Sequence, residues 1–236
     1  MIFFRERSTA AELMDDPGSD KKLLFRTFDQ FEPINRLLGR SRYFIERMLL
    51  PNMERQGSRL LTVVDIGAGG GDFALLLARS LERRGRTANI VCIDNDPRAV
   101  EYARERCRSR KNITVVRGSA FDIGKLPNRP DYLFANHLLH HLPDDACAEL
   151  LRIVHAEVAC GYLLTDLERG TLWYCLYALT AAVLFRNSFA LPDGLLSIRK
   201  GFRTAELVRI IGRAGLSPAP RVRRLLPGRL VIDNLM

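Results

Sequence analysis

Short apolar runs alternate with amphipathic helical stretches along the chain from Leu60 onward. This alternation, with β-branched residues in many of the runs, is typical of a parallel sheet covered by helices on both faces. The expected strands are Leu60–Ile66, Asn89–Asp94, Ile113–Arg117, Asp131–Asn136 and Gly161–Asp166. The expected helices between them are Gly71–Arg84, Pro97–Arg110 and Asp144–Glu157. Pro97 suits a first helical turn, because its missing N–H is not needed there.

The last part of the chain predicts a change of strand direction. A helix is expected from about Thr204 to Gly215, and two runs follow it, Leu216–Leu226 and Arg229–Leu235, with a Pro-Gly turn between them. Because no helix separates these runs, they cannot form a parallel crossover and should pair antiparallel. The predicted fold class is therefore α/β: a doubly wound, seven-stranded, mostly parallel sheet that ends in an antiparallel hairpin. A dinucleotide-binding sheet would normally continue in parallel.

Two segments lie outside this alternation. Residues 1–58 carry phenylalanines at helical spacing and are expected to form a helical N-terminal cap on a main domain of residues 59–236. Residues 167–203 are an insertion after the fifth strand, which places them over the carboxyl edge of the sheet as a lid. The residues of this lid that are expected to contact an acceptor are Trp173, Tyr174 and Tyr177.

A helix over residues 171–179 would be apolar on nearly all sides, so it must be covered on more than one face. The protein core can cover one face. For the other, the sequence leaves open an apolar acceptor, the N-terminal cap, the second subunit of a homodimer, or a peripheral contact with a membrane surface.

Composition limits these choices only in part. The 236 residues, 47% of them hydrophobic, suffice for one substantial core with a modest cap. The net charge of +9 comes from basic residues scattered through the chain, a pattern more often found on a solvated surface than at a nucleic-acid interface.

The five cysteines show neither CxxC pairs nor zinc-ligand spacing, and no signal peptide precedes them, so we expect a cytoplasmic protein without a metal site. The most apolar window, Leu172–Phe185, is shorter than the roughly 20 residues that span a bilayer.

A glycine-rich turn follows the first expected strand directly. In residues 63–72 (VVDIGAGGGD), the glycines permit positive φ and leave no Cβ in the way, so a ligand can lie against bare backbone. Asp94 ends the next strand, about 20 residues after the turn, where a carboxylate can accept hydrogen bonds from both hydroxyls of a ribose. Asp94 could instead be a simple turn residue, since the residues after it are rich in turn formers. The spacing favours a nucleoside site.

Two carboxylates flank the glycines and distinguish between nucleosides. Asp65 precedes the turn and Asp72 follows it. A pyrophosphate-binding loop favours helix N–H groups without carboxylates, because it must hold two negative charges. S-adenosylmethionine carries an ammonium and a sulfonium, so the two carboxylates favour this ligand over NAD. Asp72 could equally cap the helix and complement its dipole.

With these motifs the chain resembles the class I S-adenosylmethionine-dependent methyltransferases, specifically the small-molecule group that modifies quinols, phenols and polyketide-like products. The resemblance covers about Leu60–Gly215 and rests on residues 65–71 (DIGAGGG), Asp94 and residues 131–142 (DYLFANHLLHHL). It implies the cofactor S-adenosylmethionine, with its methionine part at the glycine turn and its ribose at Asp94. The cofactor-binding residues that it implies are Asp65, Gly67, Ala68, Gly69, Gly71, Asp94, Asn95, Ser119, Ala120 and Asn136.

The adenine contact departs from the pattern of these relatives. The resemblance places adenine beside residues 118–121, where many relatives have an aspartate or asparagine and this chain has Ser119. The serine hydroxyl can accept from the adenine amino group in the same way, or Asp122 can replace it.

Three histidines follow the fourth expected strand, at the carboxyl edge where doubly wound sheets bind ligands. These candidate catalytic residues are His137, His140 and His141. Methyl transfer is an in-line displacement that depends mostly on holding the acceptor near the methyl carbon in a dry pocket. A hydroxyl or carbon acceptor must also lose a proton, and histidine is a suitable base. His140 and His141 could instead begin and cap the helix that follows.

The sequence therefore predicts methyl transfer to a small aromatic or polyketide-like acceptor, on oxygen, in natural product or quinone-type biosynthesis. A nucleic-acid methyltransferase would explain the charge, but such enzymes typically carry an Asn/Asp-Pro-Pro-Tyr-like tetrad where this chain has residues 136–139 (NHLL). A module that binds the nucleoside without turnover would need the same glycine turn and Asp94.

Overall fold

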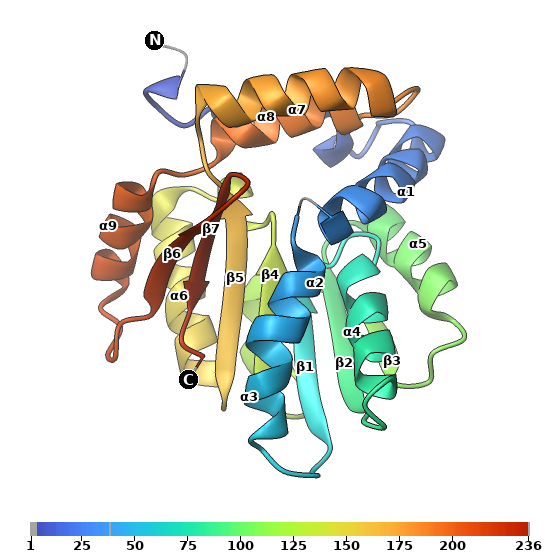
Figure 1. Cartoon of the computed structure of the whole chain (residues 1–236), viewed down its shortest axis with the longest axis vertical. Coiled ribbons are helices and arrows are strands. Elements are labelled where there is room, and N and C mark those ends of the chain that lie inside the picture. Colours follow the sequence, from blue (N-terminus) through green and yellow to red (C-terminus); the bar gives the residue numbers. More distant parts are fainter. Residues whose placement is uncertain (1–3, 38, 236) are drawn as a thin grey trace.

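The computed structural model describes residues 4–37 and 39–235. One seven-stranded sheet organises them, with the strand order β3-β2-β1-β4-β5-β7-β6 (Figure 1). The strands are β1 (Leu61–Ile66), β2 (Ala88–Asp94), β3 (Ile113–Arg117), β4 (Tyr132–Asn136), β5 (Gly161–Leu167), β6 (Arg221–Leu225) and β7 (Arg229–Asp233). β7 runs antiparallel to its neighbours β5 and β6, and the other pairs are parallel.

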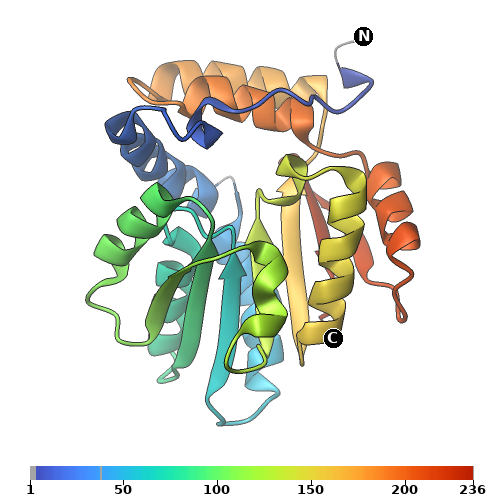
Figure 2. The ribbon, with the colours of Figure 1, turned by 180° about the vertical axis from the view of Figure 1, so that it is seen from behind.

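Helices cover both faces of the sheet, because alternate residues of each buried strand point to opposite faces. In β1, Val63 joins the core on one face and Val64 the core on the other. The helices packed on these cores are α4 (Asp72–Glu82) and α5 (Pro97–Cys107) on the first face, and α6 (Asp144–Glu157) and α9 (Thr204–Ala214) on the second. Figure 2 shows the molecule from behind, with α6 in front of the sheet.

A continuous helical stretch before β1 also packs onto the first face. It consists of α2 (Ser41–Tyr43), a π-helical turn (Phe44–Leu49) and α3 (Leu50–Glu54). Apolar side chains from this stretch, from Phe44 to Met53, are buried in the same core as Val63.

Three further helices lie over the carboxyl ends of the parallel strands (Figures 1 and 2). They are α1 (Lys21–Leu37), α7 (Thr171–Leu184) and α8 (Ala190–Lys200). The Phe31 ring of α1 packs edge-on against Phe185, which follows α7, with 6.3 Å between the ring centroids. The two segments outside the α/β alternation therefore meet above the sheet edge.

The segment before α1 is fastened to α8. The backbone N–H groups of Leu13 and Met14 each donate to the buried carboxylate of Asp193, at 2.8 Å. In Figure 2 this segment runs alongside the helices above the sheet. The division of the chain into a cap, a main domain and a lid remains a prediction.

The expected fold class is confirmed, including the hairpin that ends the sheet. Several boundaries differ from the expected ones by a few residues, and the largest difference is at β6: Leu216–Leu226 was expected as a single run, but β6 begins only at Arg221. Pro218 and Pro220 have no N–H to donate to a neighbouring strand, so pairing starts after them. No helix in the described part of the chain combines the length and apolarity needed to cross a membrane.

Candidate functional site

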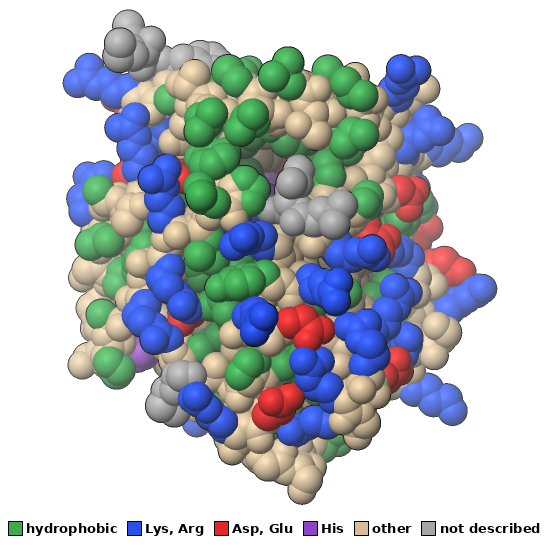
Figure 3. All heavy atoms as spheres, viewed as in Figure 1, with side chains coloured by type: hydrophobic (Ala, Val, Ile, Leu, Met, Phe, Trp, Pro, Cys, Tyr) green, Lys and Arg blue, Asp and Glu red, His purple; other side chains and the backbone are tan. Residues whose placement is uncertain are grey.

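A cavity of about 1110 Å³ lies at the carboxyl ends of β1, β2 and β4. Figure 3 shows a hollow on one face of the molecule, below an upper row of hydrophobic side chains. The expected site residues that line the cavity are Asp65, Gly67, Ala68, Gly69, Asp94, Asn95, Asn136, His137, His140, His141, Trp173 and Tyr177. The expected donor residues, histidines and lid residues therefore share one space.

Four expected residues are not part of the cavity wall among the described residues: Gly71, Ser119, Ala120 and Tyr174. Gly71 has a φ of +72°, and a Cβ there would lie 3.3 Å from the sulfur of Cys107 in α5. It therefore serves the close approach of α4 to α5. The Ser119 hydroxyl accepts from the N–H of Phe121 at 3.2 Å and caps the short 3-10 helix that contains Ala120.

Tyr174 points away from the cavity wall toward the N-terminal segment. Its ring packs edge-on against Phe4, with 5.4 Å between centroids. Trp173 and Tyr177, its neighbours on α7, do line the cavity. The helix thus divides its aromatic residues between the cavity and the N-terminal segment.

The glycine turn is held in place by the end of β2. Gly67 and Gly69 adopt positive φ values of +65° and +50°, a region that favours glycine. The Gly69 N–H donates to Asp94 Oδ2 at 2.8 Å, and the Asp96 N–H donates to Asp94 Oδ1 at 3.0 Å. Burial raises the pKa of Asp94 although these hydrogen bonds oppose the shift. Asp94 thus orders the turn and also faces the cavity, and only the second role was expected.

Asp65 is the cavity residue best suited to hold a cationic ligand. Its side chain is buried at the end of β1 and lines the cavity, and its Oδ2 has no hydrogen-bond partner among the described residues. Burial, and then the negative charges of Asp72 and Asp94, raise its pKa well above the usual range. A cationic ligand beside Asp65 would supply the absent partner and relieve the repulsion.

Asp72 occupies the first position of α4, after the N-cap residue Gly71. Its Oδ2 accepts from the Asn35 side-chain amide at 3.3 Å, and burial raises its pKa. A carboxylate in this first turn complements the helix dipole, so the capping interpretation of Asp72 is consistent with its position. It also lines the cavity, which keeps its interpretation as part of the ligand site open.

A buried ion pair joins His140, after β4, to Asp166 at the end of β5. The His140 Nδ1 lies 2.7 Å from Asp166 Oδ1, and the His140 backbone N–H donates to Asp166 Oδ2 at 3.0 Å. Burial alone would lower the pKa of His140, but the carboxylates of Asp166 and Glu12 outweigh it and raise this pKa to about 9. The same pair lowers the pKa of Asp166 although burial would raise it. His140 is therefore protonated at neutral pH.

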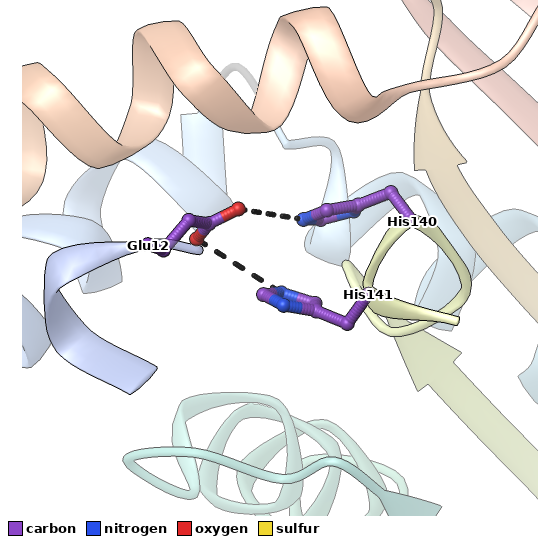
Figure 4. Close-up of side chains that lie close together, drawn as sticks. All are labelled: Glu12, His140 and His141. Carbon is purple, nitrogen blue, oxygen red and sulfur yellow. Dashed lines mark ion pairs between the residues drawn. The ribbon is translucent and has the colours of Figure 1, made fainter. Parts of the chain in front are cut away.

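Glu12, in the N-terminal segment, reaches the other side of the same histidines. Figure 4 shows its two oxygens pointing at His140 and His141, with Oε1 3.5 Å from His140 Nε2 and Oε2 4.0 Å from His141 Nε2. Burial would raise the pKa of Glu12, but its ion pair with His140 and the other nearby positive charges lower it to about 2. An anion from residue 12 thus closes a site made by β4 and β5.

Glu12, His140 and His141 stand close enough together to suggest a metal site, as do His137, His140 and Asp166. The Lys200 ammonium, however, lies 3.2 Å from Glu12 Oε1 and 3.3 Å from His141 Nδ1. The Ser197 hydroxyl also donates to Glu12 Oε1, at 2.9 Å. Because an ammonium already compensates Glu12, we interpret this group as an ion-pair network.

His137 differs from the other two histidines. It has a φ of +57°, which is uncommon for a residue with a Cβ and is often found at functional sites. Burial, and then the positive charge of Arg229, hold its pKa well below the usual range. His137 is therefore neutral at pH 7 and lines the cavity.

Arg229, at the start of β7, is a buried cation in the cavity wall. It donates to the Asn136 Oδ1 at 3.1 Å, and burial lowers its pKa to about 10 against the attraction of Asp166. Sequence reasoning missed Glu12, Asp166 and Arg229. Asp166 was detectable as a polar residue ending a strand at the ligand edge, whereas Glu12 and Arg229 reach the site only through the tertiary fold.

Residues 63–161 match the methyltransferase domain family. The chain carries a methyltransferase domain with the class I fold. The resemblance inferred from the sequence is thereby confirmed for the domain and the fold. This match contains the glycine turn, Asp94 and the three histidines of the site, and ends at the first residue of β5.

Similar proteins were found both by sequence and by structure. The demethylmenaquinone methyltransferase of Staphylococcus aureus is 23% identical over 137 residues, which are 56% of this chain and 54% of that protein. The chain thus spans about half the length of the curated relatives it matches. Magnesium protoporphyrin IX methyltransferase of Synechocystis, with bound SAH, superposes with a TM-score of 0.55 and 14% identity, over 87% of this chain and 92% of that one. Human N-acetylserotonin methyltransferase, in complex with SAM, superposes with a TM-score of 0.60 and 17% identity, over 96% and 62%.

Proposed function

We propose that the protein transfers a methyl group from S-adenosylmethionine to a small aromatic or polyketide-like acceptor, with oxygen as the accepting atom. The methyltransferase domain supports the enzyme class, and neighbours crystallised with S-adenosylmethionine or its product support the cofactor. The observation that carries the donor assignment is Asp65, a buried carboxylate in the cavity wall whose Oδ2 has no hydrogen-bond partner among the described residues.

The charges of the cavity suit this donor. Asp65, Asp72 and Asp94 all face the same space, and burial raises the pKa of each. An ammonium group beside Asp65 would reduce the free-energy cost of keeping these buried carboxylates ionised, whereas a pyrophosphate would add negative charge. Bound S-adenosylmethionine supplies a methyl group on a cationic sulfur. When the methyl group is transferred, this sulfur is the leaving group and becomes a neutral thioether.

We assign the parts of the donor to residues at the strand ends. Asp65 holds the ammonium, and the bare backbone of Gly67 and Gly69 approaches the methionine part. Asp94 accepts from the ribose hydroxyls with the lone pairs that the Gly69 and Asp96 N–H groups leave free. The remaining assigned contacts are Ala68, Asn95 and Asn136 in the cavity wall, with Ser119 and Ala120 near the adenine.

The acceptor half of the cavity is apolar and aromatic. Phe31 of α1 lines it together with Trp173, Leu176 and Tyr177 of α7. Such a wall suits a flat apolar acceptor and excludes water during transfer. The relatives are named for small-molecule acceptors, which supports this substrate class.

The protonation states divide the roles of the histidines. His140 already holds a proton at neutral pH, because its pKa is raised to about 9, so it is unsuited to accept another. His137 is neutral and lines the cavity, and we assign it as the base that takes the proton of the acceptor hydroxyl. His140, held by Asp166 and Glu12, positions the segment that carries His137. His141 lies at the edge of this group, 3.1 Å from Asp15.

The test is methyl transfer from labelled S-adenosylmethionine to a panel of phenols, quinols and polyketide-like compounds, with RNA as a competing acceptor. Mass spectrometry of small molecules that copurify with the protein would guide the choice of compounds. Label in a phenolic product would support the proposal. Label in RNA, or donor binding without transfer to any acceptor tested, would instead support one of the two alternative functions.

A further inference from the structure

Helix α7 presents an apolar face to solvent. Leu172, Leu176, Leu179 and Val183 follow one another at intervals of four, three and four residues, so they share one side of the helix. Their exposed fractions are 61, 47, 71 and 73%. Single exposed leucines are ordinary, but a contiguous apolar row of this kind marks an interaction surface.

The opposite side of the same helix lines the cavity. Trp173, Tyr177 and Ala181 belong to the cavity wall, and Leu176 belongs both to the wall and to the exposed row. A single layer of side chains therefore separates the apolar outer face from the acceptor space. Figure 3 shows the hollow directly below the upper row of hydrophobic side chains.

Positive charge stands at the first turn of α7. Tyr174 packs on Phe4, whose carbonyl accepts from the Arg203 guanidinium at 3.0 Å. Arg203 and Arg5 are both exposed, with Glu6 as the neighbouring exposed acid. Basic side chains therefore outnumber acidic ones at this end of the helix.

The other end of α7 is also positive. Arg186, exposed, follows the helix, and its carbonyl accepts from the Gln30 side-chain amide of α1 at 3.0 Å. Arg26 and Lys22, both exposed, precede Gln30 by one and two helical turns on the same side of α1. Residues 170–192 contain no Asp or Glu. Figure 3 shows Lys and Arg side chains beyond both ends of the upper hydrophobic row.

From these observations we propose that α7 docks the protein onto the surface of an anionic lipid bilayer. The helix lies in the plane of the interface, with Leu172, Leu179 and Val183 inserted among the acyl chains. The cations at its two ends contact the lipid headgroups, as basic residues beside an interfacial helix do.

The charges argue against a second copy of this chain as the occupant of the same face. Pairing α7 with α7 would bring a positive end of one copy beside a positive end of the other, whether the helices ran parallel or antiparallel. Such like-charge contacts oppose association. An anionic surface instead complements both ends at once.

Membrane docking deepens the proposed function, because it would deliver an apolar acceptor from the bilayer to the cavity beneath α7. That consequence rests on the proposed function, whereas the docking itself does not. Vesicle binding needs neither S-adenosylmethionine nor turnover, so a failure of docking and a failure of methyl transfer are distinguishable.

The experiment is cosedimentation of the full chain with vesicles of phosphatidylglycerol mixed with phosphatidylcholine, and with vesicles of phosphatidylcholine alone. The test variant is Leu179→Gln combined with Val183→Gln, since neither side chain is part of the cavity wall. The control is Val208→Gln, an exposed valine on α9. We expect the wild type and the control to bind the anionic vesicles, and the double variant to bind at least roughly ten-fold more weakly. Phosphatidylcholine alone should bind the wild type at least about five-fold more weakly.

Three results would overturn the proposal. These are no binding of the wild type to anionic vesicles, equal binding by the double variant, and equal binding to both kinds of vesicle. Sedimentation velocity is measured in parallel. A dimeric wild type together with a monomeric double variant would assign the face to a second copy of this chain.

Discussion

Protonation of His140 should make the folded protein lose stability as the pH rises above neutrality. The pKa of this histidine is raised from 6.5 to about 9, because two buried carboxylates, Asp166 and Glu12, face it. A group whose pKa is raised on folding stabilises the native state fully below its unfolded pKa. This stability is lost as the pH rises through the folded pKa.

The magnitude follows from the size of the shift. A difference of about 2.5 pKa units corresponds to about 3 kcal/mol, at 1.36 kcal/mol for each unit. The free energy of unfolding should therefore fall by about 3 kcal/mol between pH 6.5 and somewhat above pH 9. Among the described residues, the charged and titratable groups that face His140 are Asp166, Glu12, Arg7, His137 and His141, and Lys200 lies beside Glu12 and His141.

The assay is urea denaturation followed by circular dichroism across this pH range, on the wild type and on His140→Gln. The variant should be less stable than the wild type at pH 6.5, because Asp166 loses its buried partner, and its stability should fall less than that of the wild type up to pH 9. His155→Gln is the matched control, since His155 is a half-buried histidine of α6 that bonds Tyr162. A wild-type stability that stays constant or rises over this range, or an equal fall in His140→Gln, would refute the reasoning.

The remaining predictions concern turnover and the lid. If His137 is the base, His137→Ala should bind S-adenosylmethionine normally and lose on the order of 10²–10⁴ in the rate of methyl transfer, measured in single-turnover experiments. Full turnover in all three variants, His137→Ala, His140→Ala and His141→Ala, would rule out a histidine base. Trp173, the only tryptophan of the chain, should change its fluorescence when the true acceptor binds and respond little to the donor alone. Trp173→Ala should raise the KM for the acceptor while donor affinity is kept, and a variant with unchanged kinetics for every acceptor would show that α7 is scaffold and not lid.

The sheet and the donor half of the site were predictable from the sequence because their signals are local. Apolar runs of β-branched residues locate β1 to β5, and Asp94 is placed at the ligand edge simply by ending such a run. The glycine turn follows β1 directly, so its position needs no tertiary information. Even here the sequence did not indicate that Asp94 also binds the Gly69 N–H and orders the turn.

The acceptor half was predictable only in outline, because its contacts join residues far apart in the chain. Glu12 meets His140 across 128 positions, and Arg229 meets Asn136 across 93. The hydrophobic periodicity of the sequence does not indicate contacts between residues so far apart in the chain. The sequence indicated that the helix now seen as α7 is apolar on nearly all sides, but the fold was needed to show which side lines the cavity and which is exposed.

Calorimetric titration with S-adenosylmethionine and with NAD tests most directly whether the carboxylates of the cavity select the donor. The wild type should bind S-adenosylmethionine and give no heat of binding with NAD. Asp94→Ala should bind the donor more weakly by about 1.5–3 kcal/mol, the scale of a lost charge-assisted hydrogen bond. Asp145→Ala, which removes an exposed carboxylate on α6, should leave the affinity unchanged. Unchanged donor affinity in Asp94→Ala, or tight binding of NAD to the wild type, would contradict the account.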